Sequence, residues 1–232
     1  MFRSRQVIVN QWGRLKLTGP RAVSRLLAST LFPPRCSLCG FEGASLDLDL
    51  CSYCEADLPW TESGGHDLFA LRYEPPVDQM IRELKYQGVI ANARVLGVLL
   101  AQRVREHELP MPGLLVPVPL HAARLRERGF NQAFAIARYA GHMLGIPVAR
   151  NLVRRLRNTP SQTALDVHQR HHNVRGAFAV AGARAMRRLL EAGHLAIVDD
   201  VTTTGSTLQE LRETLLAAGV SRVDRWAVAR AS

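Results

Sequence analysis

The sequence predicts an α/β protein with a doubly wound parallel sheet and a small four-cysteine module ahead of it. Strand-like and helix-like stretches alternate from Leu114 to the C-terminus. The strand-like stretches are apolar along their whole length, the pattern of strands that are buried on both faces. With 232 residues, 47% of them hydrophobic and 22% charged, the chain can form one core and a small appendage.

Changes in pattern divide the chain into three regions. Residues 1–31 form an N-terminal extension, in which RAVSRLLASTLF has apolar residues at helical spacing and arginines opposite them. This pattern indicates an amphipathic docking helix, with a membrane-surface helix as the alternative. Residues 32–62 form the cysteine module, and residues 68–232 form the α/β domain. No apolar run approaches the roughly 18 residues of a membrane span, and no signal peptide is evident, so we expect a cytoplasmic protein.

The second region contains every cysteine of the chain, in two CxxC pairs with eleven residues between them. The four residues are Cys36, Cys39, Cys51 and Cys54. Two such pairs bring four thiolates within tetrahedral reach of one Zn²⁺ ion, which would stabilise a module too small for its own core. Two disulfides or a redox pair are the alternative, which a cytoplasmic setting disfavours. Four thiolate ligands leave no open coordination position, so this Zn²⁺ would be structural.

The third region predicts the following elements in order. Helical spacing covers residues 77–87 and 92–107, and the apolar run LLVPVPL (114–120) is the first strand. A helix over 131–145 ends at Gly145, and VARNLVRR (148–155) is a strand. After a polar stretch come AFAV (177–180), a helix over 183–193, a strand over 195–200, a helix over 206–219 and a strand over 223–230. In such sheets ligands bind beyond the carboxyl ends of the strands.

The stretch LAIVDDVTTTGST places two carboxylates, Asp199 and Asp200, at the carboxyl end of a buried strand. The loop that follows offers main-chain amides, short hydroxyls and a flexible glycine at a helix N-terminus, which suits one phosphate group. The loop residues are Thr202, Thr203, Thr204, Gly205, Ser206 and Thr207. Ribose hydroxyls or Mg²⁺ would separate the carboxylates from the phosphate, so a phosphorylated ribose is the predicted ligand. The alternative is a helix cap and turns without a ligand.

VDDVTTTGST resembles the motif by which type I phosphoribosyltransferases bind phosphoribosyl pyrophosphate (PRPP). The resemblance implies that Asp199 and Asp200 hold the ribose diol and that Thr202 to Thr207 surround the 5′-phosphate. In such an enzyme the loop after the first core strand contacts pyrophosphate, and here it carries Arg124, Arg126, Arg128 and Gly129. Arginine forks suit this leaving group, and Arg128 and Gly129 are the best candidates. A solvated basic turn is the alternative, especially for Arg124.

The polar stretch from Leu156 to Asn173 lies between two strands and has no apolar periodicity, which is typical of a mobile lid over an active site. Arg157, Gln162 and Arg170 are its candidates for reaching a closed site. The same stretch contains His168, His171 and His172. No cysteine or acidic cluster of ligand spacing accompanies these histidines, so we expect a solvated loop there and no metal site.

Taken together, several segments in this order resemble the ComF family, which includes ComFC and GntX-type proteins. They are the paired CxxC module, YEPPVDQMIRELKYQG, VPVPLHAARLRERGFNQA, TPSQTALDVHQRHHNVRGAF and VDDVTTTGST. The resemblance runs from about Leu26 to the C-terminus. It implies a zinc module joined to a type I phosphoribosyltransferase-like domain and, in some bacteria, a link to uptake of single-stranded DNA and natural competence.

Two functions follow as hypotheses. The first is a Mg²⁺-dependent transferase in which Asp199 and Asp200 position the ribose of PRPP, Arg128 contacts the pyrophosphate, and the acceptor is unknown. The second is a non-catalytic accessory protein that binds single-stranded DNA. The net charge of +10, from 30 Lys and Arg against 20 Asp and Glu, favours a polyanionic partner or substrate. The aromatic content of 6% offers few residues for base stacking, which disfavours the second hypothesis.

Overall fold

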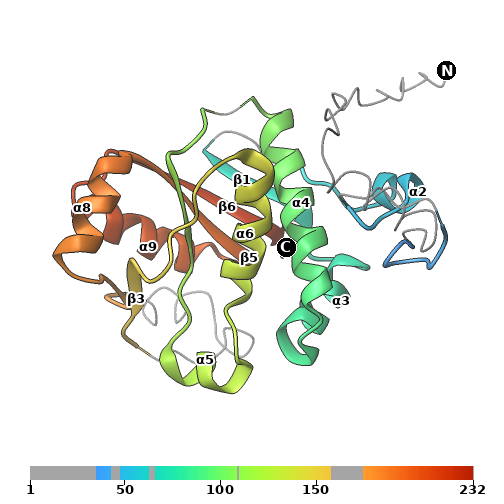
Figure 1. The fold of residues 1–232 in the computed structure, drawn as a ribbon, viewed down its shortest axis with the longest axis horizontal. Helices are drawn as coiled ribbons and strands as arrows, with labels where there is room; N and C mark the ends of the chain where they lie inside the picture. The colour runs from blue at the N-terminus through green and yellow to red at the C-terminus, as the bar shows by residue number, and fades with distance from the viewer. Residues whose placement is uncertain (1–34, 43–47, 63–65, 109, 158–174, 232) are drawn as a thin grey trace, which may run out of the picture.

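The computed structural model describes residues 35–42, 48–62, 66–108, 110–157 and 175–231, and Figure 1 shows their arrangement. Four parallel strands form the central sheet in the order β1-β6-β5-β2. Their bounds are β1 (Asp67–Arg72), β2 (Leu114–Pro117), β5 (His194–Thr202) and β6 (Arg222–Arg230). The predicted parallel sheet is therefore confirmed. The predicted helix of the N-terminal extension lies outside the described residues.

Both faces of this sheet are covered, as the uninterrupted apolar strands predicted. In β5, Ala196 and Val198 belong to an apolar cluster with α4 and α6, whereas Leu195 and Ile197 belong to the cluster on the other face with α8 and α9. The alternation of side chains along a strand assigns neighbouring residues to opposite faces. Since every one of these side chains is buried, each position requires an apolar residue.

The helices predicted over 92–107, 131–145, 183–193 and 206–219 begin and end close to those residues. The bounds of the described helices are α2 (Ser52–Ala56), α3 (Val77–Arg82), α4 (Ile90–Glu106), α5 (Ala122–Arg128), α6 (Gln132–Leu144), α8 (Ala183–Ala192) and α9 (Ser206–Ala217). Helix α6 begins where the Asn131 side chain accepts a hydrogen bond from the Phe134 amide at 3.2 Å, and it ends at Gly145 in the left-handed conformation. The predicted helix over 77–87 is continuous, but its second half is a π-helical segment, η1 (Glu83–Gln87). None of the described helices is both long and apolar enough to cross a bilayer.

Three expectations about local structure were wrong. Strand β1 was missed, and the arginine segment expected to be a loop is helix α5. The strand expected over 148–155 is broken at Asn151, whose φ of 60° is left-handed. Before the break, Val148 forms a single parallel bridge to Leu115. After it, β3 (Val153–Arg155) pairs antiparallel with β4 (Phe178–Val180), forming a separate two-stranded sheet.

The cysteine module packs against α4. Buried residues of the module, Cys36 and Leu50 among them, belong to the same apolar cluster as the buried side of α4. Two polar contacts join the surfaces: Gln102 Nε2 donates to Glu55 Oε1 at 3.0 Å, and Arg94 pairs with Asp49 at 3.3 Å. The module therefore shares its core with the α/β part and rests on the helix that covers one face of the sheet.

Helices α4 and α6 approach each other closely at Gly97. A Cβ atom at this position would lie 2.6 Å from the main-chain oxygen of Ile136 and 2.8 Å from the Cβ of Tyr139. Both distances are far below van der Waals contact, and the first involves backbone that cannot rotate away. A glycine within a helix loses about 1 kcal/mol relative to alanine, but here it permits the two helices to pack on the sheet together.

Candidate functional site

The carboxylate pair lies near the carboxyl end of β5, as predicted. The strand continues two residues beyond the pair to Thr202, because Val201 and Thr202 are in register with Ala229 and Arg230 of β6. Each carboxylate accepts a hydrogen bond from the next main-chain amide: Asp200 N donates to Asp199 Oδ1 at 2.9 Å, and Val201 N donates to Asp200 Oδ1 at 2.8 Å. These bonds fix both side chains on a rigid strand.

Lys85 supplies a cation to this pair. Its Nζ lies 2.9 Å from Asp200 Oδ2, and both side chains are largely buried, with 20% and 10% of their surface exposed. Burial alone would lower the pKa of Lys85, but the charge and hydrogen bond of Asp200 outweigh it and raise the pKa above its ordinary value. Sequence reasoning missed this residue, because one lysine in a helical pattern carries no signal of where its ammonium group lies.

Asp199 does not titrate like an ordinary aspartate. Loss of hydration and the adjacent charge of Asp200 raise the pKa of Asp199 to about 8, although Lys85 acts in the opposite direction. A single lysine therefore offsets only part of the repulsion between two neighbouring carboxylates. The site is one where additional positive charge, or hydrogen-bond donors such as hydroxyls, would be favourable.

The loop after β5 leads directly into the N-terminus of α9. Thr202 is the buried last residue of β5, so the loop itself runs from Thr203 to Gly205, and Ser206 begins the helix. Gly205, the N-cap residue, has a φ of 77°, which favours glycine. Thr204 Oγ1 donates to Ser206 Oγ at 3.1 Å and accepts a long bond from the Ser206 amide at 3.4 Å. Main-chain amides, hydroxyls and the positive end of the helix dipole thus gather beside the carboxylate pair.

The structure brings Arg128, the last residue of α5, close to this centre. Its guanidinium lies over the ring of Tyr86 at 5.4 Å, and its charge opposes the protonation of the adjacent Lys85. Gly129 ends the helix with a φ of 77° and lets the chain turn there. Arg126 is exposed on the same short helix.

The other predicted contact residues lie elsewhere or outside the described residues. Arg157 is exposed and donates from Nη1 to the main-chain oxygen of Arg175 at 2.9 Å. The rest of the predicted lid lies outside the described residues, including Gln162, Arg170 and three histidines, His168, His171 and His172. Arg155 of β3 was not singled out from the sequence. Burial and the charge of Arg124 lower its pKa, while the charge of Asp199 acts in the opposite direction, which places Arg155 within electrostatic reach of the carboxylate pair.

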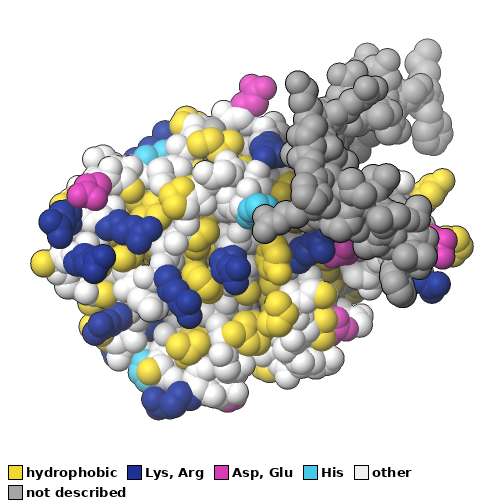
Figure 2. Space-filling view, viewed as in Figure 1, with side chains coloured by type: hydrophobic (Ala, Val, Ile, Leu, Met, Phe, Trp, Pro, Cys, Tyr) yellow, Lys and Arg dark blue, Asp and Glu magenta, His cyan; other side chains and the backbone are white. Residues whose placement is uncertain are grey.

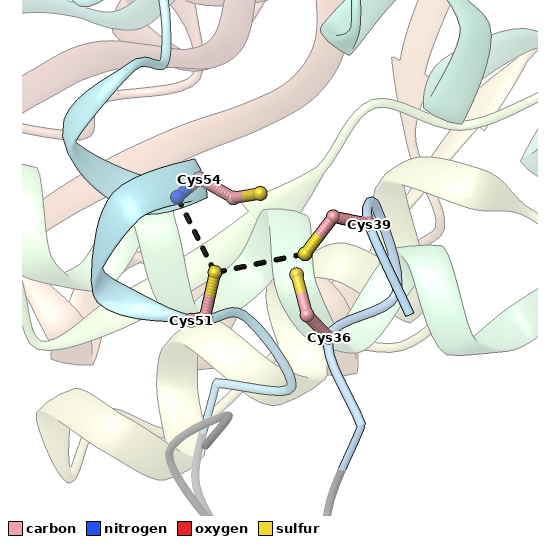
Figure 3. A group of neighbouring side chains, drawn as sticks. All are labelled: Cys36, Cys39, Cys51 and Cys54. Atoms are coloured by element: carbon pink, nitrogen blue, oxygen red, sulfur yellow. Dashed lines mark hydrogen bonds between the residues drawn. The ribbon is translucent and has the colours of Figure 1, made fainter. Parts of the chain in front are cut away.

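A second candidate site is formed by the four cysteines (Figure 3). Cys36 and Cys39 lie on a turn, Cys51 is the N-cap of α2, and Cys54 lies within that helix, with all four side chains pointing toward one another. Their sulfur atoms lie within 4.8 Å of one another, and Cys39 and Cys51 are 3.8 Å apart. Tetrahedral Zn–S bonds of about 2.3 Å require sulfur separations of about 3.8 Å. All four cysteines are free, so the predicted disulfide alternative is not present.

Protonation also distinguishes these thiols. Burial raises the pKa of Cys54, and the neighbouring cysteines raise it further. For Cys36, burial acts in the same direction, but hydrogen bonds from the backbone around Cys39 and Cys51 lower the pKa to about 6. Four thiolates this close repel one another, so a divalent cation is required to hold them all ionised. The arrangement is compatible with a structural Zn²⁺ site.

Several bacterial proteins are similar to this chain over most of its length. Competence protein F of Haemophilus influenzae is 33% identical over 197 residues, which cover 83% of this chain and 84% of that protein. The DNA utilization protein YhgH of Escherichia coli strain K12 is 30% identical over 84% of this chain and 83% of its own length. YhgH of Salmonella typhi is 34% identical over 68% of this chain and 69% of its own length. No protein-family model matches the chain.

Solved structures give weaker similarities. A glutamine PRPP amidotransferase from B. subtilis aligns with 57% of this chain at 19% identity and a TM-score of 0.37. The aligned part covers 25% of the amidotransferase chain. A purine phosphoribosyltransferase from Pyrococcus horikoshii aligns with 72% of this chain and 88% of its own at 16% identity and a TM-score of 0.34. TM-scores this low add no argument to the strand order and site geometry described above.

Proposed function

Because the chain belongs to the ComF family, together with competence protein F and the YhgH proteins, we propose that it binds PRPP and transfers its phosphoribosyl group. One observation carries the proposal: a buried carboxylate pair on β5 is followed within a few residues by a hydroxyl-rich turn at the N-terminus of α9. This arrangement matches the two ends of a ribose 5-phosphate. The vicinal diol donates hydrogen bonds to carboxylates, and the phosphate accepts them from amides and hydroxyls.

Different residues would hold the ribose and the 5′-phosphate of the substrate. Asp199 and Asp200 would hold the ribose hydroxyls, while Thr203, Thr204 and the first turn of α9 would hold the 5′-phosphate. Lys85 pairs with one oxygen of Asp200, and the remaining lone pairs of this carboxylate can accept hydrogen bonds from the diol. Gly205 allows the turn to approach the phosphate without a side chain in the way.

The leaving group would be pyrophosphate, and Arg128 with Lys85 supplies positive charge for it. In the transfer, the bond between C1′ and the pyrophosphate oxygen breaks with both electrons going to that oxygen, while a lone pair of the acceptor forms the new bond to C1′. Fixed cations near the departing oxygen stabilise the developing charge. Mg²⁺ would be held chiefly by substrate oxygens and water, as is usual for this ion, because Lys85 already occupies Asp200.

The four cysteines would hold a structural Zn²⁺ ion. The module shares its apolar core with α4. Zn²⁺ therefore stabilises the helix that covers one face of the sheet and would act on function only through the fold.

Calorimetric titration with PRPP, with and without Mg²⁺, tests the central claim. We expect binding that depends on Mg²⁺ and that the double variant Asp199→Asn, Asp200→Asn loses, while the control Glu191→Gln on α8 retains it. The two asparagine substitutions keep the side-chain volume of Asp199 and Asp200 but remove the negative charge to which the diol would donate hydrogen bonds. Absence of binding by folded wild-type protein would contradict the proposal. If wild-type protein binds PRPP, release of pyrophosphate on addition of a candidate acceptor would identify the reaction.

The names of the relatives favour a second candidate, binding of single-stranded DNA in DNA uptake or utilisation. Its support in this chain is the charge of +10 and the arginines on α5 and β3. Figure 2 shows basic side chains, and few acidic ones, over the face that carries α6 and α8. If the chain binds DNA, affinity should fall steeply with salt, and Arg126→Glu should weaken it without changing PRPP binding. An equal loss of both ligands in the aspartate double variant would refute this separation.

A further inference from the structure

Gln132, the first residue of α6, carries a buried amide group without a partner. Only 2% of the residue is exposed, and its Nε2 makes no hydrogen bond within the described part of the chain. Buried polar groups are nearly always hydrogen-bonded, because leaving one unpaired destabilises the fold. Trp226 Nε1 is also unpaired among the described residues, but it lies within the apolar cluster that includes α4. Gln132 differs in its position, at the end of the sheet that carries the carboxylate pair.

Two hydrogen bonds attach the start of α6 to the strand that carries the carboxylates. Asn131, the N-cap residue, donates from Nδ2 to the main-chain oxygen of Val118 at 3.0 Å. The Val118 amide in turn donates to the main-chain oxygen of Val198 at 2.9 Å. Val198 directly precedes the carboxylate pair in β5. The first turn of α6 is therefore fixed beside the carboxyl end of β5, where the pair lies.

Gln132 also lies on the side of the sheet to which Asp200 points. Side chains alternate along a strand, so Asp200 points to the same side as Val198, which belongs to the apolar cluster with α4 and α6. On α6, Gln132 lies one turn before Ile136, another member of this cluster, and residues four apart share one face of a helix. Both polar side chains therefore lie at the carboxyl end of the same buried layer.

Helices α4 and α6 lie side by side and run in the same direction (Figure 1). Gly97 of α4 faces the main-chain oxygen of Ile136, and further along both helices Arg105 donates to the main-chain oxygen of Met143. Their first turns therefore lie at the same end, where η1, which contains Lys85, leads into α4. The unpaired amide and the ammonium group of Lys85 thus come from neighbouring helical segments to the same end of the same face.

A hydroxyl group is the ligand that matches an amide donor beside a carboxylate. A carboxylate only accepts hydrogen bonds, so a hydroxyl that donates to Asp200 retains lone pairs for the amide of Gln132. A phosphate oxygen would also accept from the amide, but in this place it would meet the negative charge of the carboxylate pair. A hydrogen atom instead of the hydroxyl would leave the buried amide unpaired in the complex as well.

We propose that Gln132 donates a hydrogen bond to the 2-hydroxyl of a ribose phosphate and so selects ribose over 2-deoxyribose. The inference rests on the proposed binding of the ribose diol by Asp199 and Asp200, and it adds a residue that recognises one hydroxyl of that diol. The 2-hydroxyl is assigned because Gln132 closely follows Arg128, which is proposed to contact the pyrophosphate on C1, and C2 is the neighbouring carbon. A site that hydrogen-bonds a substrate hydroxyl rejects the analogue that lacks it, because its buried polar groups are then left unpaired.

Calorimetric titration with ribose 5-phosphate and 2-deoxyribose 5-phosphate tests this role in wild-type protein and in Gln132→Met. Methionine keeps the length of the side chain and removes the amide donor. We expect wild-type protein to prefer ribose 5-phosphate by at least about tenfold, and the substitution to weaken the binding of ribose 5-phosphate by about tenfold, the effect of losing one hydrogen bond. Binding of 2-deoxyribose 5-phosphate should be equal in both proteins, because this ligand has no hydroxyl for the amide.

The thermal stability of the unliganded protein separates a ligand-binding role from a structural one. Gln132→Met should leave the Tm unchanged or raise it, because the amide has no partner to lose in the described part of the chain. The matched control is Gln102→Met on α4, where the amide donates to Glu55 at 3.0 Å. This control should lower the Tm and leave the affinity for both sugar phosphates as in wild-type protein.

The proposal is overturned if wild-type protein binds the two sugar phosphates equally, or if Gln132→Met binds ribose 5-phosphate as tightly as wild-type protein does. It is also overturned if Gln132→Met weakens only PRPP, which would place the amide on the pyrophosphate, or if it lowers the Tm as far as Gln102→Met. The proposed function fails if wild-type protein binds neither PRPP nor ribose 5-phosphate. The role of Gln132 alone fails if wild-type protein binds both and the substitution changes neither affinity.

Discussion

Replacing Lys85 with methionine should destabilise the unliganded protein in a manner that depends on pH. The substitution keeps an apolar stem of similar length but removes the cation that lies 2.9 Å from Asp200 Oδ2. Because both side chains are largely buried, the change removes the cation that is paired with Asp200 and leaves the repulsion between two neighbouring carboxylates less compensated. Breaking a buried ion pair by removing one partner costs about 3–5 kcal/mol.

Protonation of Asp199 decides how much of this cost is observed. Burial and Asp200 raise the pKa of Asp199 to about 8, and loss of Lys85 raises it further, so at pH 6 the pair holds a proton and one negative charge. The expected loss at pH 6 is then about 1–3 kcal/mol, the cost of one unsatisfied charged hydrogen-bond partner. At pH 9 more of the pair is ionised and the full 3–5 kcal/mol is expected. Lys85 itself does not titrate in this window, because its folded pKa is above its ordinary value. Lys85 therefore stays protonated at both pH values, and the difference between them comes from the carboxylate pair.

Urea denaturation at pH 6 and pH 9, without Mg²⁺ or sugar phosphate, measures both values. Arg82→Met, on the preceding turn of the same helical segment, is the matched control, because its ion pair with Asp78 is exposed on the arginine side and is worth little. The double variant Lys85→Met, Asp200→Asn should recover most of the lost stability, since it removes the unpaired charge. The reasoning is refuted if Lys85→Met and Arg82→Met have the same stability at both pH values, or if Asp200→Asn gives no recovery.

Three further outcomes follow from the structure. Asp199→Asn should raise the stability of the unliganded protein at pH 8 by at least about 1.4 kcal/mol, the value of one pKa unit, and should reduce the fall in stability between pH 4 and pH 8. The sign follows because a raised folded pKa means that the folded state retains a proton that the unfolded state has lost; an unchanged pH slope in urea denaturation would contradict it. Gly97→Ala should lower the unfolding free energy by about 1–3 kcal/mol, since the added Cβ would meet the Ile136 backbone at 2.6 Å. A rise in Tm, as helix propensity alone predicts, would show that α4 can move away from α6. Cys51→Ser should abolish the binding of one Zn²⁺ per chain. Both this substitution and removal of the metal with a chelator should lower the Tm, because the module shares its core with α4. Stoichiometric zinc in the serine variant, measured by elemental analysis, would exclude the four-thiolate site.

Much of the fold could be predicted because buried apolar residues recur in the sequence at the spacing of the helix or strand that contains them. The strand at Leu195 to Val198 is apolar at every residue since it contacts helices on both faces, and helix α6 carries its own cap at Asn131 and its own end at Gly145. Strand β1 was missed because DLFALR is short and no helical pattern precedes it. The break at Asn151 was missed because an asparagine in the left-handed region looks like any polar residue in a strand.

For the candidate sites, the sequence by itself determined which groups are close along the chain. The two CxxC pairs and the run from Asp199 to Ser206 are such groups, because a few residues of backbone hold them together. Only the tertiary structure decided which distant groups join them: Lys85 pairs with Asp200, Arg128 lies over Tyr86, and Arg155 lies within electrostatic reach of Asp199. The physical reason is that an interaction between charges depends on their distance in the folded structure. The residues next to a cation in the sequence, in a helix or a short strand, do not indicate which carboxylate it will face.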